Sequence, residues 1–306
     1  MEIERGFTRE CLLGVEEVRY HGGCNDGWLS AYAAHYLINK YRGRQVDLVS
    51  MTYGAPIPPI TRPTLFVDWC PPIEWLKTQD QVDLIGIIDH HQTAEPAIKY
   101  WQDRGGKVVF DVHHSAARLT WEQYYVNVNP DGVYCPWEVA YVEDRDLWRF
   151  QLDHSREINA YLATVPHTVA AWSAIALLSS ERLPSLVLDE ARGAYAAINE
   201  YVAKTAAQGF VATIDDIMMP IVNATYQHGS EVAEELMRVT GDHVAAYFFQ
   251  RQDGKWQYGF RSAPHFDCSV IAKKFGGGGH KNAAGCQVDA PIHVHRSSDL
   301  SYGDNF

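Results

Sequence analysis

The sequence contains the stretch Leu84-Ile85-Gly86-Ile87-Ile88-Asp89-His90-His91, an apolar run of strand length that ends in one acid and two imidazoles. A short run rich in Ile and Leu is typical of a strand buried in a parallel sheet. In open α/β sheets, ligands bind just beyond the carboxyl ends of such strands. We therefore expect Asp89, His90 and His91 to lie where the chemistry is done, although an isolated pair of histidines would more often begin a solvated loop.

Three other apolar runs, which we also expect to be strands, end in residue types that bind metals. The run 15–20 leads to His21, Cys24 and Asp26, the run 64–67 leads to Asp68, and the run 139–142 leads to Asp144 and Asp146. Imidazole and carboxylate ligands together suit Mn, Fe, Co or Zn, and several shared carboxylates suit a centre with two metal ions. Four such endings in one chain predict a metal site at one edge of a sheet, with Cys24 as a further candidate ligand.

The order of the expected elements predicts an α/β fold. Strand-like runs alternate with stretches of helical spacing, which is the mark of a parallel sheet with right-handed crossovers. A second histidine pair, His113 and His114, precedes a stretch of helical spacing at 116–125. These two residues can simply begin that helix, and we expect a supporting, substrate-facing or structural role for them rather than metal binding.

The length of 306 residues suffices for two domains. We expect a parallel-sheet domain over 1–187, a linker helix over 188–214 and a smaller α/β domain over 215–306. An Asp-Gly turn at 253–254 lies between two apolar runs, which predicts a β-hairpin in the second domain.

The charge balance limits the partners of the protein. The net charge of −12 argues against a long nucleic-acid track, because affinity for a long polyanion grows with the number of phosphates that the protein neutralises. An anionic substrate should therefore be short. The first residues carry no apolar signal core, and no run approaches the ~20 apolar residues of a membrane span. The six cysteines lack the spacing of a zinc knuckle, so we expect reduced thiols and a cytoplasmic enzyme with no membrane partner.

Two motifs carry a resemblance to a known family. One is Asp89-His90-His91, and the other is the stretch Phe275-Gly276-Gly277-Gly278-Gly279-His280-Lys281-Asn282-Ala283-Ala284-Gly285. Together they resemble the DHH phosphoesterase superfamily with the DHH-associated C-terminal domain, which includes nanoRNA-degrading and RecJ-like enzymes. The resemblance extends from about His21 to about Val288 and implies two divalent metal ions, usually manganese, that hydrolyse a phosphoester.

The resemblance also implies roles for individual residues. His21 and Asp68 resemble ligands of one metal ion, and Asp26, Asp68 and His90 resemble ligands of the other, with Asp68 as the bridge. A further acid is expected from Asp144 or Asp146, and the sequence leaves that choice open. Asp89 would orient His90 as a supporting carboxylate, and His91 would contact the phosphate.

Cys24 departs from the family pattern. Many relatives carry Asp-x-Asp in the first loop, whereas this chain has Cys24-Asn25-Asp26. If Cys24 binds a metal ion, its softer thiolate should shift the preference from manganese toward zinc, iron or cobalt. If Cys24 does not bind, the first metal position is weaker.

The glycine run at 276–279 calls for a physical reason, because consecutive glycines lose much entropy on folding. One reason is a backbone that approaches an anion closely and turns its N–H groups toward it. Gly277, Gly278, Gly279 and His280 are therefore candidate phosphate contacts, and a flexible linker is the alternative. Arg261 resembles the phosphate- or base-contacting arginine of the family.

These observations predict a metal-dependent phosphodiesterase that cleaves short oligoribonucleotides or linear dinucleotides to nucleoside monophosphates. The alternatives are a phosphatase acting on a bisphosphorylated nucleotide, an exopolyphosphatase, and a catalytically silent nucleotide-binding module. The expected partner is a short oligonucleotide or nucleotide substrate, and a homodimer remains open.

Overall fold

A computed structural model describes residues 6–128, 135–177, 183–292 and 295–296. The segment 1–5, in which the sequence shows no signal core, lies outside the described residues. The chain divides into two compact units, Met1–Tyr195 and Ala196–Phe306.

The first unit is built on a five-stranded sheet whose neighbouring strands all run parallel. Its strand order is β2-β1-β3-β4-β5. The strands are β1 Glu17–His21, β2 Asp47–Met51, β3 Thr64–Val67, β4 Ile85–Asp89 and β5 Lys107–Phe110. The expected parallel α/β sheet is therefore confirmed, and the stretch quoted first supplies β4 near its centre.

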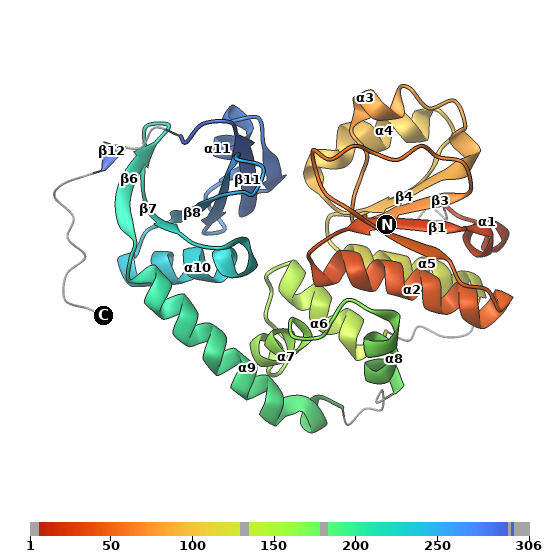
Figure 1. Cartoon of the computed structure of the whole chain (residues 1–306), viewed down its shortest axis with the longest axis horizontal. Coiled ribbons are helices and arrows are strands. Elements are labelled where there is room, and N and C mark those ends of the chain that lie inside the picture. Colours follow the sequence, from red (N-terminus) through yellow and green to blue (C-terminus); the bar gives the residue numbers. More distant parts are fainter. Residues whose placement is uncertain (1–5, 129–134, 178–182, 293–294, 297–306) are drawn as a thin grey trace. The chain divides into compact units, whose positions relative to one another are not determined.

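Alternation along each strand divides the apolar side chains between two cores. In β3, Leu65 and Val67 pack into the larger core, and Phe66 packs into the core on the opposite face. Helices α2 (Asn25–Arg42) and α5 (Ala116–Val128) cover the first face, and α3 (Ile73–Leu76) and α4 (Glu95–Asp103) cover the second (Figure 1). Burying one such large apolar side chain stabilises the fold by roughly 1.5–3 kcal/mol, so both helical layers hold the sheet in place.

The expectation of a strand at 139–142 is wrong, because these residues lie in helix α6 (Trp137–Asp146). Four apolar residues fit either a buried strand or a helix, and periodicity alone does not separate the two. The wider spacing decides it, since Glu138, Tyr141 and Val142 recur at three- and four-residue intervals and are all buried. Pro136 precedes the first turn, where a missing N–H costs nothing.

The expected linker helix over 188–214 is wrong at its C-terminal end. Helix α9 runs from Leu183 to Ala206, and Phe210–Ile214 forms strand β6. Gly209 follows the helix end, and the segment Phe210–Ile214 then alternates buried and partly buried residues as a strand does. The remaining described helices of the first unit are α1 Arg9–Gly14, the 3₁₀ helices η1 Val82–Leu84 and η2 Gln92–Ala94, α7 Ser155–Leu162 and α8 Val169–Leu177.

The second unit contains a seven-stranded sheet in the order β10-β11-β9-β8-β7-β6-β12. All its neighbouring strands are antiparallel except β7 and β8. The remaining elements are β7 Ile217–Asn223, η3 Tyr226–His228, α10 Gly229–Thr240, β8 Val244–Gln250, β9 Trp256–Ser262, α11 Ser269–Lys274, β10 Gly278–His280, β11 Ala283–Val288 and β12 His295–Arg296. Strands β8 and β9 form the hairpin that the Asp-Gly turn predicts.

The two helices of this sheet pack into separate cores. Leu236 of α10 lies with Ala245 and Tyr247 in one core, and Ile271 of α11 lies with Phe260 in the other. The second, smaller α/β unit is therefore confirmed.

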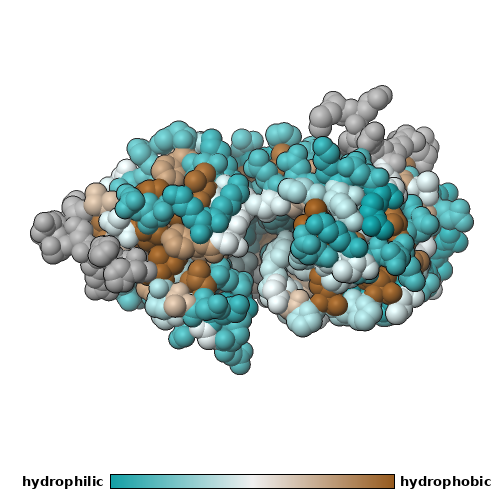
Figure 2. All heavy atoms as spheres, turned by 90° about the horizontal axis from the view of Figure 1, so that it is seen from above, coloured by the Kyte–Doolittle hydropathy of each residue, from teal (hydrophilic) through white to brown (hydrophobic). Residues whose placement is uncertain are grey.

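The helices of the described residues include no candidate membrane span. None of the helices in that part of the chain combines the length and the apolar character that crossing a bilayer requires. In the face drawn in Figure 2, hydrophilic residues cover most of the surface and hydrophobic residues form separate patches.

Candidate metal centre

The sheet order of the first unit places two candidate residues at a topological switch point. The chain leaves the carboxyl end of β1 for β2 on one side, and β3 lies on the other side of β1. In doubly wound sheets, ligands bind in the crevice at this position. His21 ends β1 and Asp68 follows β3, so the two residues flank the switch point.

Asp68 lies at the centre of the cluster and faces ligands on two sides. Its Oδ2 atom is 3.4 Å from Nδ1 of His21 and 3.2 Å from Sγ of Cys24. Its Oδ1 atom is 3.2 Å from Nε2 of His90. The Asp68 side chain is buried, and among the described residues no donor makes a well-directed hydrogen bond to its Oδ1 atom. Asp68 also has a φ of +54°, a left-handed conformation that Asp tolerates better than most residues.

The first ligand group consists of His21, Cys24 and Asp68, each of which offers one ligand atom within 4.8 Å of the others. Cys24 is the N-cap of α2, and its Sγ accepts a hydrogen bond from the Gly27 N–H at 3.3 Å. A Cβ atom at Gly27 would lie 2.2 Å from the His21 carbonyl oxygen and 3.1 Å from Asp68 Oδ2. Glycine is therefore required at this position for the loop and the strand end to approach one another.

The second ligand group consists of Asp26, His90 and Asp146. Nε2 of His90 lies 3.6 Å from Asp26 Oδ2 and 3.5 Å from Asp146 Oδ2. Both oxygens of Asp26 accept backbone hydrogen bonds at 2.9 Å, from the N–H groups of Ala116 and Ala117. The N-terminus of α5 thus fixes the orientation of this carboxylate, and the helix dipole favours its negative charge.

The two acids of α6 occupy different environments. Asp144 is buried, and its carboxylate accepts hydrogen bonds from the backbone N–H groups of Gln151 at 2.9 Å and Leu152 at 3.1 Å. Asp146 is the acid whose carboxylate reaches His90. The structure therefore brings Asp146 into the second ligand group, whereas Asp144 holds the turn that follows the helix.

Asp89 fixes the turn after β4. Its Oδ1 atom accepts hydrogen bonds from the backbone N–H groups of His90 at 2.7 Å and His91 at 3.1 Å. The same oxygen lies 2.7 Å from Nδ1 of the His91 ring. Asp89 therefore positions His90 through its backbone and orients the ring of His91.

The charges of the cluster shift the pKa values of its members. Burial alone would raise the pKa of Asp68, but the close imidazoles of His21 and His90 hold it well below its ordinary value. Burial alone would lower the pKa of His90, but Asp146 and Asp68 hold it well above its ordinary value. Burial, with Asp68 and Asp146, raises the pKa of Asp26. Without a cation, Asp26 and His90 thus favour their protonated forms and Asp68 its charged form, and a divalent cation would take the place of the protons on Asp26 and His90.

The donor set fits metal binding. Three carboxylates, two imidazoles and one thiol converge, and the buried Asp68 Oδ1 atom lacks a well-directed hydrogen bond from the described residues. This buried carboxylate oxygen, 3.2 Å from His90 Nε2, is well placed to bind a cation. The acidic and histidine groups at this sheet edge could therefore hold divalent metal.

Only the second half of the glycine run lies in a strand, and Gly276 and Gly277 form the turn before it. Gly278–His280 is β10, the edge strand of the second sheet, and it pairs with Ala283–Gly285 of β11. A Cβ atom at Gly277 would lie 2.1 Å from the Gly285 carbonyl oxygen, and one at Gly279 would lie 2.5 Å from the Ala283 carbonyl oxygen. Close packing of these two strands accounts for both glycines, and the linker alternative is wrong.

The register of the second sheet aligns Arg261 with His280. Arg261 of β9 is opposite Ala283 of β11, which is in turn opposite His280 of β10. Directly opposed residues share a face, and two strand spacings separate the outer Cα atoms by roughly 10 Å. The guanidinium of Arg261 donates a hydrogen bond of 2.6 Å to the Ser230 hydroxyl, which holds it on that face.

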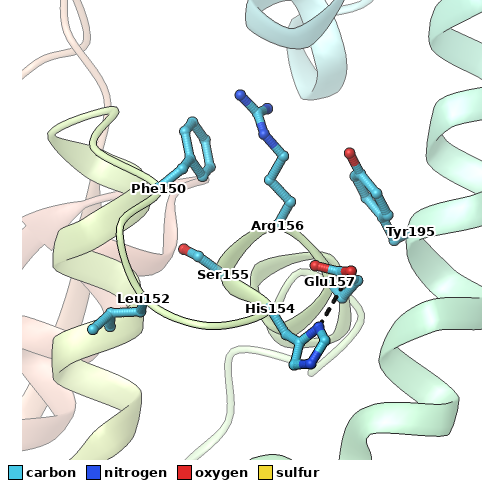
Figure 3. A pocket seen from close by; sticks show the side chains of 7 residues that line it. All are labelled: Phe150, Leu152, His154, Ser155, Arg156, Glu157 and Tyr195. Carbon is cyan, nitrogen blue, oxygen red and sulfur yellow. Dashed lines mark ion pairs between the residues drawn. The ribbon is translucent and has the colours of Figure 1, made fainter.

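A separate pocket of about 280 Å³ lies in the first unit (Figure 3). Its wall includes Phe150, Arg156 and Tyr195, and the Arg156 guanidinium lies 3.8 Å from the centroid of the Phe150 ring. None of the residues that line it belongs to either ligand group. We therefore place the candidate chemistry at the sheet edge and not in this pocket.

Sequence reasoning missed Tyr53, which follows β2 at the same sheet edge. Its ring lies 5.5 Å from the His21 ring and 5.6 Å from the Trp69 ring, and 39% of the residue is exposed. Its position just beyond Met51, where the apolar run of β2 ends, was the available signal. The carboxylate-holding role of Ala116 and Ala117 was also missed, since backbone N–H groups carry no sequence signal.

Comparison with known proteins gives one family match and several similar folds. Residues 215–299 match the DHHA1 domain. An uncharacterized protein of Acanthamoeba polyphaga mimivirus is 23% identical over an alignment of 295 residues. The alignment covers 89% of this chain and 67% of that protein.

Three solved structures have similar folds. Exonuclease RecJ bound to manganese has a TM-score of 0.51 and 15% identity, with 94% of this chain and 91% of that chain covered. An exopolyphosphatase-related protein from Bacteroides fragilis has a TM-score of 0.51 and 12% identity, with 92% and 90% covered. A DHH domain described as a member of a family of ribosomal proteins has a TM-score of 0.52 and 14% identity, with 94% and 84% covered. At these identities the likeness shows the fold.

Proposed function

We propose that this chain, which combines a C-terminal DHHA1 domain with the fold of the DHH phosphoesterase superfamily, hydrolyses phosphoester bonds at a centre for two divalent metal ions. The observation that carries the proposal is the geometry of Asp68. Its two oxygens face different ligand groups, at 3.2 Å from Cys24 Sγ and 3.2 Å from His90 Nε2. A single carboxylate in this position can serve both groups.

The bound metal ions would lower the pKa of a water molecule and neutralise phosphoryl oxygens. The residues of the chain would position the metal ions and the phosphate. The N-terminus of α5 holds Asp26 in one orientation through two hydrogen bonds. Asp26, His90 and Asp146 supply two carboxylates and one imidazole, a set that suits Mn²⁺.

His91 would donate a hydrogen bond to the phosphate. Burial alone would lower the pKa of His91, but the Asp89 carboxylate raises it above its ordinary value. The contact of Nδ1 with Asp89 orients the ring, and Nε2 would be its proton donor toward substrate. An imidazolium at this point favours the charge that develops on a phosphoryl oxygen.

The substrate that fits best is a short oligoribonucleotide or linear dinucleotide, cleaved to nucleoside monophosphates. Tyr53 offers a partly exposed aromatic ring beside His21, on which a nucleobase could stack. Arg261 and His280 share one face of the second sheet and could bind a phosphate. The net charge of −12 disfavours a longer chain of phosphates.

A length series of 5′-labelled oligoribonucleotides tests the proposal, with a bisphosphorylated nucleotide and polyphosphate as competing substrates. Turnover should peak at two to a few nucleotides and fall on longer chains. Arg261→Ala should raise KM for a dinucleotide and have less effect on a minimal aryl phosphodiester. Arg238→Ala is the matched control, because Arg238 is an exposed arginine of the same unit that pairs with Glu235.

Each result of this series has a defined meaning. Faster turnover on a long strand would refute the length limit. Selective hydrolysis of polyphosphate or of the bisphosphorylated nucleotide would refute the proposed oligoribonucleotide substrate but not the proposed metal centre. Metal binding without hydrolysis of any of these compounds would indicate a silent nucleotide-binding module.

A further inference from the structure

The two ligand groups of the centre differ in the softness of their donors. The first contains a thiol, an imidazole and one oxygen of Asp68, whereas the second contains the carboxylates of Asp26 and Asp146 with the imidazole of His90. Thiolates prefer softer ions such as Zn²⁺, and carboxylates prefer harder ions such as Mn²⁺. The same centre therefore presents unlike positions to the metal ions.

The position of Cys24 supports a ligand role rather than simple packing. Its Sγ lies 3.2 Å from Asp68 Oδ2 and 3.4 Å from His21 Nδ1, so it points at the other two donors and not into an apolar core. The residue is only partly buried. Its neighbour Asp68 is a buried carboxylate whose Oδ1 atom lacks a well-directed hydrogen bond from the described residues.

The start of α2 favours a metal-bound thiolate, although burial and Asp68 raise the pKa of the metal-free Cys24 thiol well above its ordinary value. Cys24 is the N-cap of this 18-residue helix, with extended backbone angles, and the Gly27 N–H donates to its Sγ at 3.3 Å. The positive end of the helix dipole and this N–H both favour negative charge on sulfur. A thiolate here carries the same charge as a carboxylate, so the charge available to neutralise a divalent cation is preserved while the softness changes.

We propose that the centre binds two different ions. A thiolate-preferring ion such as Zn²⁺ would be held by His21, Cys24 and Asp68. Mn²⁺ would be held by Asp26, His90, Asp146 and Asp68. The inference rests on the proposed function, because it concerns the same centre. It adds that the chain binds the first ion through sulfur and that the two positions do not exchange ions freely.

Substitution of Cys24 by Ser or Asp provides the test without loss of the fold, because both residues are good N-caps for α2. Cys11→Ser is the matched control, since Cys11 is another partly buried cysteine that lies outside both ligand groups. All proteins are compared with the wild type by circular dichroism before metal is added.

The first readout is absorption on addition of Co²⁺. Wild type and Cys11→Ser should show the near-ultraviolet charge-transfer absorption of a Co²⁺–thiolate bond, and Cys24→Ser and Cys24→Asp should lack it. Absence of the signal in wild type, or its survival in Cys24→Ser, would overturn the inference.

The second readout is the Zn²⁺ retained after dialysis against excess Mn²⁺ and a chelator of moderate affinity. Wild type should keep about one Zn²⁺ per chain by this assignment, and its Cys24 should resist alkylation by iodoacetamide. Cys24→Ser should lose Zn²⁺ affinity by at least the roughly 10–100-fold that loss of a ligand's supporting partner costs. Equal Zn²⁺ retention by wild type and Cys24→Ser would contradict the assignment.

Hydrolysis by the Mn²⁺-loaded proteins separates this inference from the proposed function. Hydrolysis by wild type with no thiolate signal would refute the inference alone. Failure of wild type and both variants to bind any divalent ion would refute both.

Discussion

Separate substitutions of Asp144 and Asp146 should have different effects, one on the stability of the fold and the other on metal binding. The two acids are two residues apart in α6, but only Asp146 reaches His90, whereas Asp144 holds the backbone of the following turn. Asp144→Ala should therefore weaken the fold and leave metal binding in place. Asp146→Ala should weaken metal binding and leave the stability of the metal-free fold in place.

The magnitude for Asp144 follows from its two hydrogen bonds. A hydrogen bond to a charged group contributes about 1.5–3 kcal/mol to stability. The N–H groups that Asp144 would release belong to Gln151, which is exposed, and to Leu152, which is 38% exposed. Water can partly replace the lost acceptor, so we expect a total loss of about 2–3 kcal/mol, which corresponds to a fall in Tm of roughly 5–10 °C for a unit of this size.

Asp146 should behave differently without metal. Asp146 helps to raise the pKa of Asp26 by repulsion and the pKa of His90 by attraction, so its electrostatic effects on the metal-free cluster oppose one another. Its removal should leave the metal-free Tm nearly unchanged.

Thermal melts in the presence of a chelator, followed by Mn²⁺ titration and hydrolysis assays, compare the two variants. We expect a lower Tm with metal binding retained in Asp144→Ala, and an unaltered Tm with weakened Mn²⁺ binding and lost turnover in Asp146→Ala. Loss of metal binding in Asp144→Ala at an unchanged Tm would show that the acids have been assigned the wrong way round.

Three further predictions concern other parts of the chain. Burial raises the pKa of Glu138 from 4.5 to about 7. Between these pH values the unfolded chain loses a proton that the folded chain keeps. The free energy of unfolding should therefore fall by about 3 kcal/mol as the pH rises from 4.5 to about 7, and level off above it. Glu138→Gln should abolish this slope in urea melts between pH 5 and 8, and a slope equal to that of wild type would contradict the role of burial. His90→Ala should abolish hydrolysis and keep a metal-free melt close to that of wild type, because the residue supplies a ligand at a strand end; retained turnover would exclude it from the centre. Gly277→Ala should lower the Tm because its Cβ would meet the Gly285 carbonyl. The Cβ of Gly193→Ala in α9 would meet nothing within 4 Å, so this variant should raise stability by about 0.5–1 kcal/mol. Equal Tm values for the two variants would show that the segment around Gly277 accommodates a Cβ atom without destabilising the fold.

The gathering of His21, Asp68 and Asp89 at one sheet edge could be predicted because parallel strands deliver their carboxyl ends to the same side. The secondary structure of residues 139–142 could not be predicted from four apolar residues, because such a run fits both a helix and a strand. The resemblance to the DHH family leaves Asp144 and Asp146 equivalent, but residues two apart on a helix point about 200° away from one another. Only the helix geometry therefore separates them.

The glycine run shows a different limit. The sequence indicates that a close approach is needed at 276–279, but not whether the approaching group is an anion or another strand. Pairing of β10 with β11 supplies a strand, and the distances at Gly277 and Gly279 show that the sheet alone requires both glycines. A role in phosphate binding for this segment stays a prediction.

The most direct test of the metal centre is the metal content and phosphodiester turnover of Asp68→Asn beside the wild type, with circular dichroism to verify the fold. Asp68 faces both ligand groups, and an amide cannot replace a carboxylate that neutralises two cations. Wild type should bind two divalent ions per chain and hydrolyse a short phosphodiester, and folded Asp68→Asn should lose turnover and bind fewer ions. Turnover and metal content equal to those of wild type in Asp68→Asn would contradict the two-metal centre.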